Sequence, residues 1–150
     1  MDTNPALVDA ARLVGDWKMD LYNAAFLPGP GARAAGSARV EWTEDGGALV
    51  LRQGDPANPH AATWTIGRDE AETDFLVLYA DDRGVSRIYR MSLQGGDWRL
   101  WRDAPGFSQR FSARIDPDGQ VIRGRWEKSL DGGKTWEHDF NLDYLRVPRS

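Results

Sequence analysis

The two histidines carry the side chains that titrate most readily near neutral pH. His138 lies in the run from Trp136 to Tyr144, where every second residue is apolar except His138 itself. Alternation in a strand places His138 on the same face as those apolar residues, toward a core. There it serves as a neutral core histidine, a ligand contact or a general base, and the sequence leaves these roles open. His60 ends a Pro-rich run, and we expect it to be exposed.

Further polar residues share predicted inward faces with apolar neighbours. Arg87 is the most unfavourable of them to bury, because a buried charge without a partner lowers the stability of the fold. A carboxylate ligand or a core acid would neutralise it, and otherwise it lies in water at the edge of the interior. Tryptophans on inward positions either fill the interior or line a pocket for a flat apolar molecule. The candidate ligand-binding residues are His138, Gln109, Tyr89, Arg87, Trp126, Trp42 and Tyr144.

Composition removes several classes of chemistry. The chain has no cysteine, which excludes disulfides, thiolate nucleophiles and cysteine metal sites. Two histidines are too few for a multi-histidine metal centre, and we expect neither a metal nor a cofactor. A net charge of −4 and a pI near 5.2 argue against general nucleic-acid binding. The first residues lack the basic and apolar regions of a secretory signal, and no apolar run could span a membrane, so we expect a cytoplasmic protein.

The 150 residues form about one domain, and most of it is predicted as strand and turn. Clusters of Asp, Gly and Pro after residue 80 mark tight turns, which make consecutive strands antiparallel. The predicted strands are 16–22, 37–43, 48–53, 62–67, 75–80, 85–93, 98–102, 108–115, 121–128 and 135–147. Long segments at 23–36 and 54–59 are either lids or plain connections.

An open meander of ten strands would leave two unpaired edges, and closing the sheet removes both. We therefore predict an all-β fold, an antiparallel up-and-down β-barrel of eight to ten strands. Its tryptophan-bearing face points inward, and its arginine-bearing face is solvated. Residues 5–13 predict one short helix, capped by Thr3 or Asn4, that ends at Gly15 and packs over one end of the barrel.

Gly15-Asp16-Trp17, after a short helix, resembles the Gly-x-Trp signature of the calycins, the superfamily of lipocalins and fatty-acid-binding proteins. The resemblance implies that Trp17 crosses the closed end of a barrel and that Arg146 packs on it. Such a cation–π contact contributes about 0.5–2 kcal/mol. The segment from Trp126 to Trp136, with Tyr144 and Arg146, looks like a group of bacterial lipocalin-like proteins.

Nitrobindin-type haem barrels within the calycins extend the signature to Gly-x-Trp-x-Gly and use a histidine on the final strand. Met19 stands at the later glycine position here, and His138 lies nearer the start of its strand than that pattern has it. Haem is therefore the less favoured interpretation.

Two further motifs have simpler structural explanations. The run from Ser129 to Trp136 matches the Asp-box of sialidase propellers, S-x-D-x-G-x-T-W. One copy cannot build a propeller of several blades, so we interpret the run as a hairpin turn. The cluster from Trp98 to Arg102 has residue types that stack nucleobases, but alternation places Trp98 and Leu100 inside, with Arg99 and Trp101 outside.

These observations favour noncovalent binding of a small, partly apolar ligand inside the barrel. The alternative is a cofactor-independent enzyme, a cyclase or isomerase acting on a natural-product-like substrate, with His138 or a buried carboxylate as its acid or base. Whether the chain is an enzyme stays open at this point. The expected partner is a small apolar or amphipathic molecule, with no nucleic acid and no membrane, and a homodimer is left open.

Overall fold

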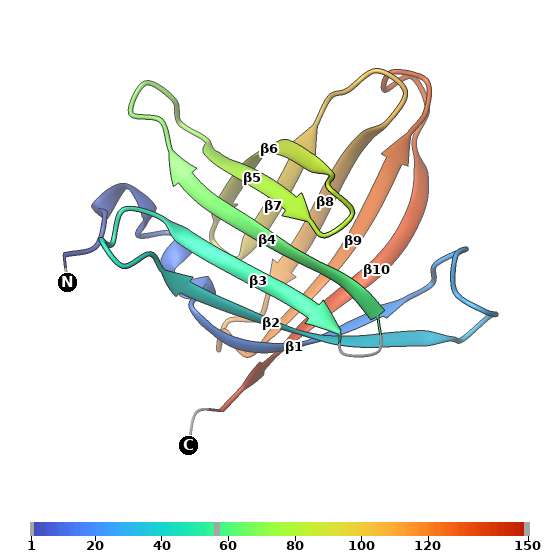
Figure 1. The fold of residues 1–150 in the computed structure, drawn as a ribbon, viewed down its shortest axis with the longest axis horizontal. Coiled ribbons are helices and arrows are strands. Elements are labelled where there is room, and N and C mark those ends of the chain that lie inside the picture. The colour runs from blue at the N-terminus through green and yellow to red at the C-terminus, as the bar shows by residue number, and fades with distance from the viewer. Residues whose placement is uncertain (1, 56–57, 149–150) are drawn as a thin grey trace.

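The computed structural model describes residues 2–55 and 58–148, with side chains described outside residues 55–60. Ten strands form a closed barrel in which each strand pairs antiparallel with its neighbours in sequence, and the first strand closes the ring against the last (Figure 1). The predicted all-β up-and-down barrel is confirmed. The strands are β1 (Gly15–Tyr22), β2 (Arg33–Trp42), β3 (Leu49–Asp55), β4 (Asn58–Arg68), β5 (Phe75–Asp81), β6 (Ser86–Gln94), β7 (Asp97–Arg102), β8 (Ser108–Ile115), β9 (Val121–Ser129) and β10 (Glu137–Val147).

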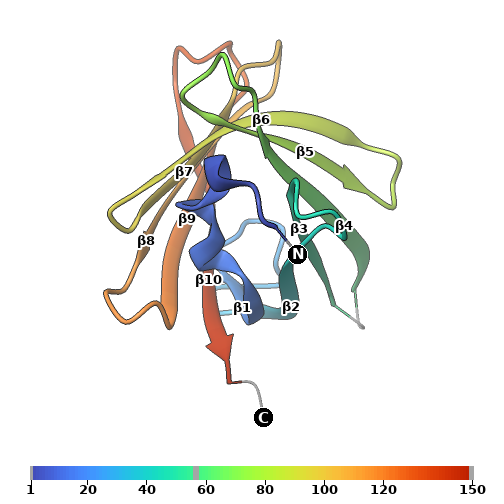
Figure 2. The same cartoon turned by 90° about the vertical axis from the view of Figure 1, so that its left-hand side faces the viewer.

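Two 3-10 turns, η1 (Pro5–Leu7) and η2 (Ala10–Leu13), stand where the sequence predicts one helix. The side-chain oxygen of Asn4 accepts a hydrogen bond from the Ala6 amide at 3.0 Å and caps η1. The segment is too short to hold an α-helix by its own hydrogen bonds, so packing decides its form. Leu7 and Leu13 are buried there, and the turns lie across one end of the barrel, the closed end (Figure 2). No helix within the described residues is long and apolar enough to cross a membrane.

Arg146 fastens the closed end. Its guanidinium carbon lies 4.2 Å from the ring centre of Trp17, which is the contact that the Gly-x-Trp resemblance implies. The same guanidinium donates to the carbonyl oxygens of Val14, Arg12 and Gly119 at 2.7, 2.8 and 3.0 Å. It therefore ties β10 to the N-terminal segment and to the turn between β8 and β9.

Strand boundaries differ from those that the sequence predicts, most at β2, at β3 and β4, and at β10. β2 begins at Arg33, so the first long loop is shorter than expected. β3 reaches Asp55 and β4 begins at Asn58, so most of the Pro-rich run is strand rather than loop. β10 begins at Glu137, and its register against β9 shifts between His138 and Phe140, which marks a β-bulge.

Burial is graded along the barrel axis. Near the closed end, inward side chains such as Trp17 and Val40 are buried. Further along the same two strands, Leu21 and Ala34 also point inward, yet both are partly exposed. The barrel is therefore packed at its closed end, and solvent reaches the inward residues at the opposite, open end.

Candidate functional site

Four rings meet inside the barrel and form what we call the aromatic cluster: Trp64 from β4, Tyr79 from β5, Tyr89 from β6 and Trp126 from β9. The Trp64 and Tyr89 rings are parallel within 2°, with their centres 6.0 Å apart. Trp126 meets both rings edge-on, at 6.2 and 5.7 Å. Tyr79 likewise meets Trp64 and Tyr89 edge-on. Strands distant in sequence thus supply one continuous aromatic surface.

Polar groups adjoin this surface. The Tyr89 hydroxyl donates a hydrogen bond of 2.7 Å to Oε1 of Gln109 on β8, and both residues are buried. Burial raises the pKa of Tyr89, while the positive charges of Arg87 and Arg102 act in the opposite direction. Both guanidinium groups therefore lie close enough to influence the phenol, which stays neutral and remains a donor at physiological pH.

Several buried polar atoms have no partner within the described part of the chain. Nε1 of Trp64, Nε of Arg102 and Oε1 of Gln53 are among them, and all three belong to inward residues at or near the aromatic cluster and the open end. The others are Nε1 of Trp98, deeper in the core, and Oδ1 of Asp143, on the outer face. Buried polar groups are nearly always hydrogen-bonded, so unpaired donors beside an aromatic surface indicate a place for a bound molecule or water.

The inward arginines differ from those on the outer face. Most outward arginines are paired with acids, as in Arg110 with Glu127 at 3.1 Å, and Arg114 is an exception among the described residues. Within the described residues, no carboxylate lies in ion-pair distance of Arg87 or Arg102. The Arg87 guanidinium instead lies over the rings of Tyr79 and Phe107, at 5.7 and 5.2 Å from their centres. These two cations therefore keep unused capacity for an anion.

The structure brings together four of the residues that the sequence predicts for the site: Tyr89, Gln109, Arg87 and Trp126. It separates two others. Trp42 ends β2 at the closed end and packs, half-buried, against the core. Tyr144 is buried beside Trp17 and Trp98, with ring centres 6.4 and 5.8 Å away.

His138 is exposed, whereas alternation predicted that it faces the core. The bulge between His138 and Phe140 explains the difference, because an extra residue in one strand reverses the side on which earlier residues point. Nε2 of His138 lies 3.2 Å from the Asn23 carbonyl oxygen, beneath the β1–β2 loop. A pocket of about 450 Å³ lies between this loop and His138. His60 falls outside the described side chains, so its predicted exposure remains a prediction.

Trp64, Tyr79 and Arg102 were not singled out for the site from the sequence. The sequence does contain a signal for Arg102, because it lies on the same face of its strand as Trp98 and Leu100, which alternation places inside. Tyr79 likewise continues the inward series of Phe75 and Val77. The unpaired Nε1 of Trp64 and Nε of Arg102, in contrast, can be recognised only in the structure, because their surroundings come from several strands.

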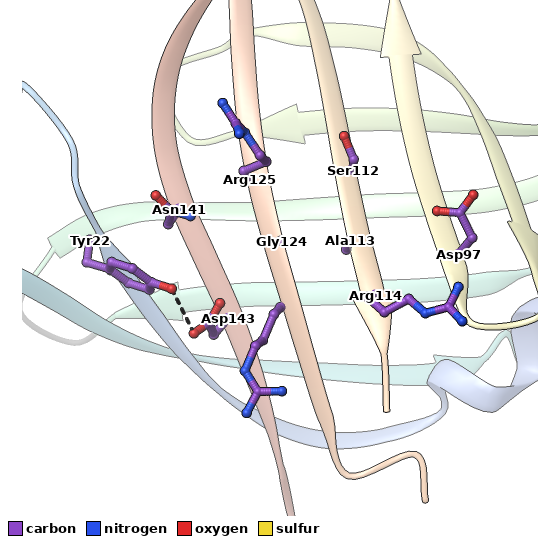
Figure 3. A pocket seen from close by; sticks show the side chains of 10 residues that line it. Tyr22, Asp97, Ser112, Ala113, Arg114, Gly124, Arg125, Asn141 and Asp143 are labelled. Atoms are coloured by element: carbon purple, nitrogen blue, oxygen red, sulfur yellow. Dashed lines mark hydrogen bonds between the residues drawn. The ribbon is translucent and has the colours of Figure 1, made fainter. Parts of the chain in front are cut away.

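A second hollow, of about 460 Å³, lies on the outer face of β7 to β10, where Tyr22 of β1 also contributes (Figure 3). The Tyr22 hydroxyl donates to Asp143 at 3.1 Å there. Of its arginines, Arg123 pairs with Asp116 at 3.2 Å, and Arg125 lies 3.9 Å from Glu127. The predicted solvated arginine face is thus observed. Arg114, the third arginine of this hollow, has no carboxylate in ion-pair distance among the described residues, so the hollow has one unpaired arginine and the open end has two.

The Asp-box run is a hairpin turn, as the sequence predicts. Asp131 accepts from the Thr135 amide at 2.9 Å and from the Ser129 hydroxyl at 2.8 Å. The Arg110 guanidinium covers the Trp136 ring at 4.1 Å on the outer side of the barrel. Ser129, Asp131 and Thr135 are therefore used in the turn itself, and Trp136 is used in a contact with β8.

No protein-family model matches the chain, and no curated protein matches it either. Among solved structures, the chain is similar to the crystal structure of Rv2717c from M. tuberculosis. The match has a TM-score of 0.68 and 14% sequence identity, and it covers 98% of this chain and 100% of the other. At this identity the similarity shows a shared barrel fold across the whole chain.

Proposed function

We propose that the protein binds a small, partly apolar molecule noncovalently in the open end of its barrel, as a lipocalin-like protein of the calycin type would. One observation carries this proposal: buried donors without partners in the described residues, Nε1 of Trp64 and Nε of Arg102, lie at the aromatic cluster, directly behind the partly exposed Tyr79. A ligand there would cover apolar surface, at about 25 cal/mol per Å², and would pair these donors. Of the predicted residues, the partly exposed Arg87 would contact it directly, and the buried Tyr89, Gln109 and Trp126 would support the site from behind.

The enzymatic alternative loses His138, one of the two acid or base candidates named for it, because His138 lies opposite the outward Glu127 in the β9–β10 register. The other candidate was a buried carboxylate. The position of His138 does not suit a haem inside the barrel, since an axial histidine must point at the iron. Trp42 and Tyr144 adjoin the closed end, and we propose for them a packing role beneath the site.

Binding is tested with N-phenyl-1-naphthylamine, a neutral probe that fluoresces in apolar sites. We expect saturable binding to the wild-type protein. Ala34 and Ala35 of β2 offer matched variants, because Ala34 points inward at the open end and Ala35 points outward. Ala34→Phe fills the open end and should weaken binding by about tenfold or more, which corresponds to about 1.4 kcal/mol.

Ala35→Phe adds the same side chain to the outer face and should bind as the wild type does. Equal affinity of both variants, or no saturable binding by the wild type, would contradict the proposal.

A further inference from the structure

The interior at the open end is cationic although the protein is acidic overall. The chain has a net charge of −4, and outward arginines are largely paired with carboxylates. Inside, Arg87 and Arg102 have no carboxylate partner within the described residues. Lys128, next to Gln109 in the register of β8 and β9, is 3.8 Å from Asp139.

Asp81, at the end of β5 on the inward face, accepts from the Tyr79 hydroxyl at 2.7 Å and is paired with Arg83 at 2.6 Å. Arg87 and Arg102 are thus the inward cations without an ion-pair partner among the described residues.

The depth available to a ligand is limited. Ile66, Leu51, Leu100 and Phe111 point inward below the aromatic cluster, and each is at most 2% exposed. Side chains buried to this degree leave no room beside them for a molecule larger than water. A long alkyl chain running down the barrel axis therefore has no path, and a ligand must fit in the open half.

Arg102 presents the most specific contact. Its Nε is buried and unpaired, although a guanidinium N–H is among the strongest donors in proteins. In the β7–β8 register Arg102 lies opposite Gln109, whose oxygen already holds the Tyr89 hydroxyl. An oxyanion accepting from Arg102 would therefore lie beside the Tyr89 ring, which belongs to the aromatic cluster.

We propose that the ligand is a compact aromatic oxyanion: one or two fused rings that bear a carboxylate, sulfonate or phosphate group. The rings pack on Tyr79, the partly exposed ring of the aromatic cluster, because Trp64, Tyr89 and Trp126 are only 2–5% exposed and lie behind it. The oxyanion accepts hydrogen bonds from Arg102 and Arg87. This inference rests on the proposed function and specifies its ligand class.

Two probes of nearly the same shape separate the inference from the proposed function. 8-Anilinonaphthalene-1-sulfonate carries an anionic group, and N-phenyl-1-naphthylamine is its neutral counterpart. We expect the sulfonate to bind about tenfold more tightly or better, as for a charge-assisted hydrogen bond. Equal affinities would overturn the anion inference and leave the proposed function standing. Failure of both probes to bind would remove the proposed function itself.

Variants then locate the charge that matters. Arg102→Met and Arg87→Met should each weaken binding of the sulfonate more than binding of the neutral probe, and a cooperative urea unfolding transition reports that each variant is folded. Arg102→Lys keeps the charge and should retain part of the preference. Arg114→Met, in the outer hollow, is the matched control and should change nothing. If Arg114→Met removes the preference instead, the anion binds outside and the inference is wrong.

Competition against the bound sulfonate identifies the oxyanion. 1-Naphthoate, 1-naphthalenesulfonate and 1-naphthyl phosphate distinguish the three groups, and 1-naphthylmethanol is the uncharged control. We expect at least one of the anions to compete about tenfold better than the alcohol. Hexadecanoate, a long-chain carboxylate, should compete less well than the best aromatic anion. Tighter binding of hexadecanoate would refute the compact shape.

Discussion

At the scale of single residues, a local hydrogen-bond network shifts the pKa of a side chain. Asp131 accepts hydrogen bonds from Ser129 and from both the amide and the hydroxyl of Thr135. These bonds stabilise the carboxylate and lower its pKa to about 2. The hairpin between β9 and β10 therefore depends on the charge state of one exposed aspartate.

The first prediction concerns this charge. An unfolded aspartate titrates near 3.9, so the contribution of Asp131 is complete above about pH 4 and is lost as pH falls through about 2. The NMR shift of the Thr135 amide should follow that loss, with a midpoint near pH 2. Asp131→Asn should abolish the titration. A midpoint near 4 in the wild type would show that the hydrogen bonds do not hold in solution.

At the scale of elements, glycine decides how closely two strands and a ring can pack. A Cβ on Gly124 of β9 would lie 2.5 Å from a ring carbon of Phe111 and 3.0 Å from the Leu142 carbonyl oxygen. Gly67 in β4 has open space at the same position. The two glycines thus form a natural comparison between a packed and an unpacked strand position.

We predict that Gly124→Ala lowers the free energy of unfolding by about 1–3 kcal/mol, the usual cost of overpacking a core. Gly67→Ala should change it by no more than about 0.5 kcal/mol, as for most surface substitutions. Urea denaturation followed by tryptophan fluorescence measures both. Equal effects would mean that β9 has room that the structure does not show.

The elements also show where prediction from the sequence succeeds and where it fails. Ten strands follow from turn clusters such as 116–119, because Asp, Gly and Pro restrict the backbone locally. Alternation also places Tyr89, Gln109 and Trp126 inside correctly. The bulge before Phe140 has no such local signal, and for that reason His138 was placed on the wrong face. The unpaired Nε of Arg102 depends on side chains from several strands and cannot be read from one of them.

At the scale of the whole molecule, the closed end of the barrel holds the fold together and the open end carries the candidate binding site. Arg146 and Trp17 join the termini of the chain at the closed end, while the aromatic cluster adjoins the open end. Closure of the sheet into a barrel was predictable, because an open meander of ten strands would leave two unpaired edges. The closed end was also expected, because the sequence places residues 5–13 over one end and the Gly-x-Trp resemblance places Trp17 there. The burial gradient toward the open end was not specified by the sequence.

This division predicts that stability and binding can be changed independently. Arg146→Ala removes a cation–π contact and three hydrogen bonds to carbonyl oxygens. We expect it to lower the free energy of unfolding by about 2–4 kcal/mol, measured by urea denaturation. The affinity of the folded variant for N-phenyl-1-naphthylamine should stay within about twofold of the wild type, because a distant site is not coupled to the change. A large loss of affinity would show that the ends are coupled.

The most direct measurement of the central proposal follows the indole N–H resonances of the seven tryptophans during a titration with 1-naphthoate. Nε1 of Trp64 is unpaired at the aromatic cluster, and Trp126 borders it. We predict saturable shifts of the Trp64 and Trp126 resonances, with little change at Trp17 in the closed end. Largest shifts at Trp101 and Trp136, outside the barrel, with Trp64 unmoved, would contradict binding in the open end.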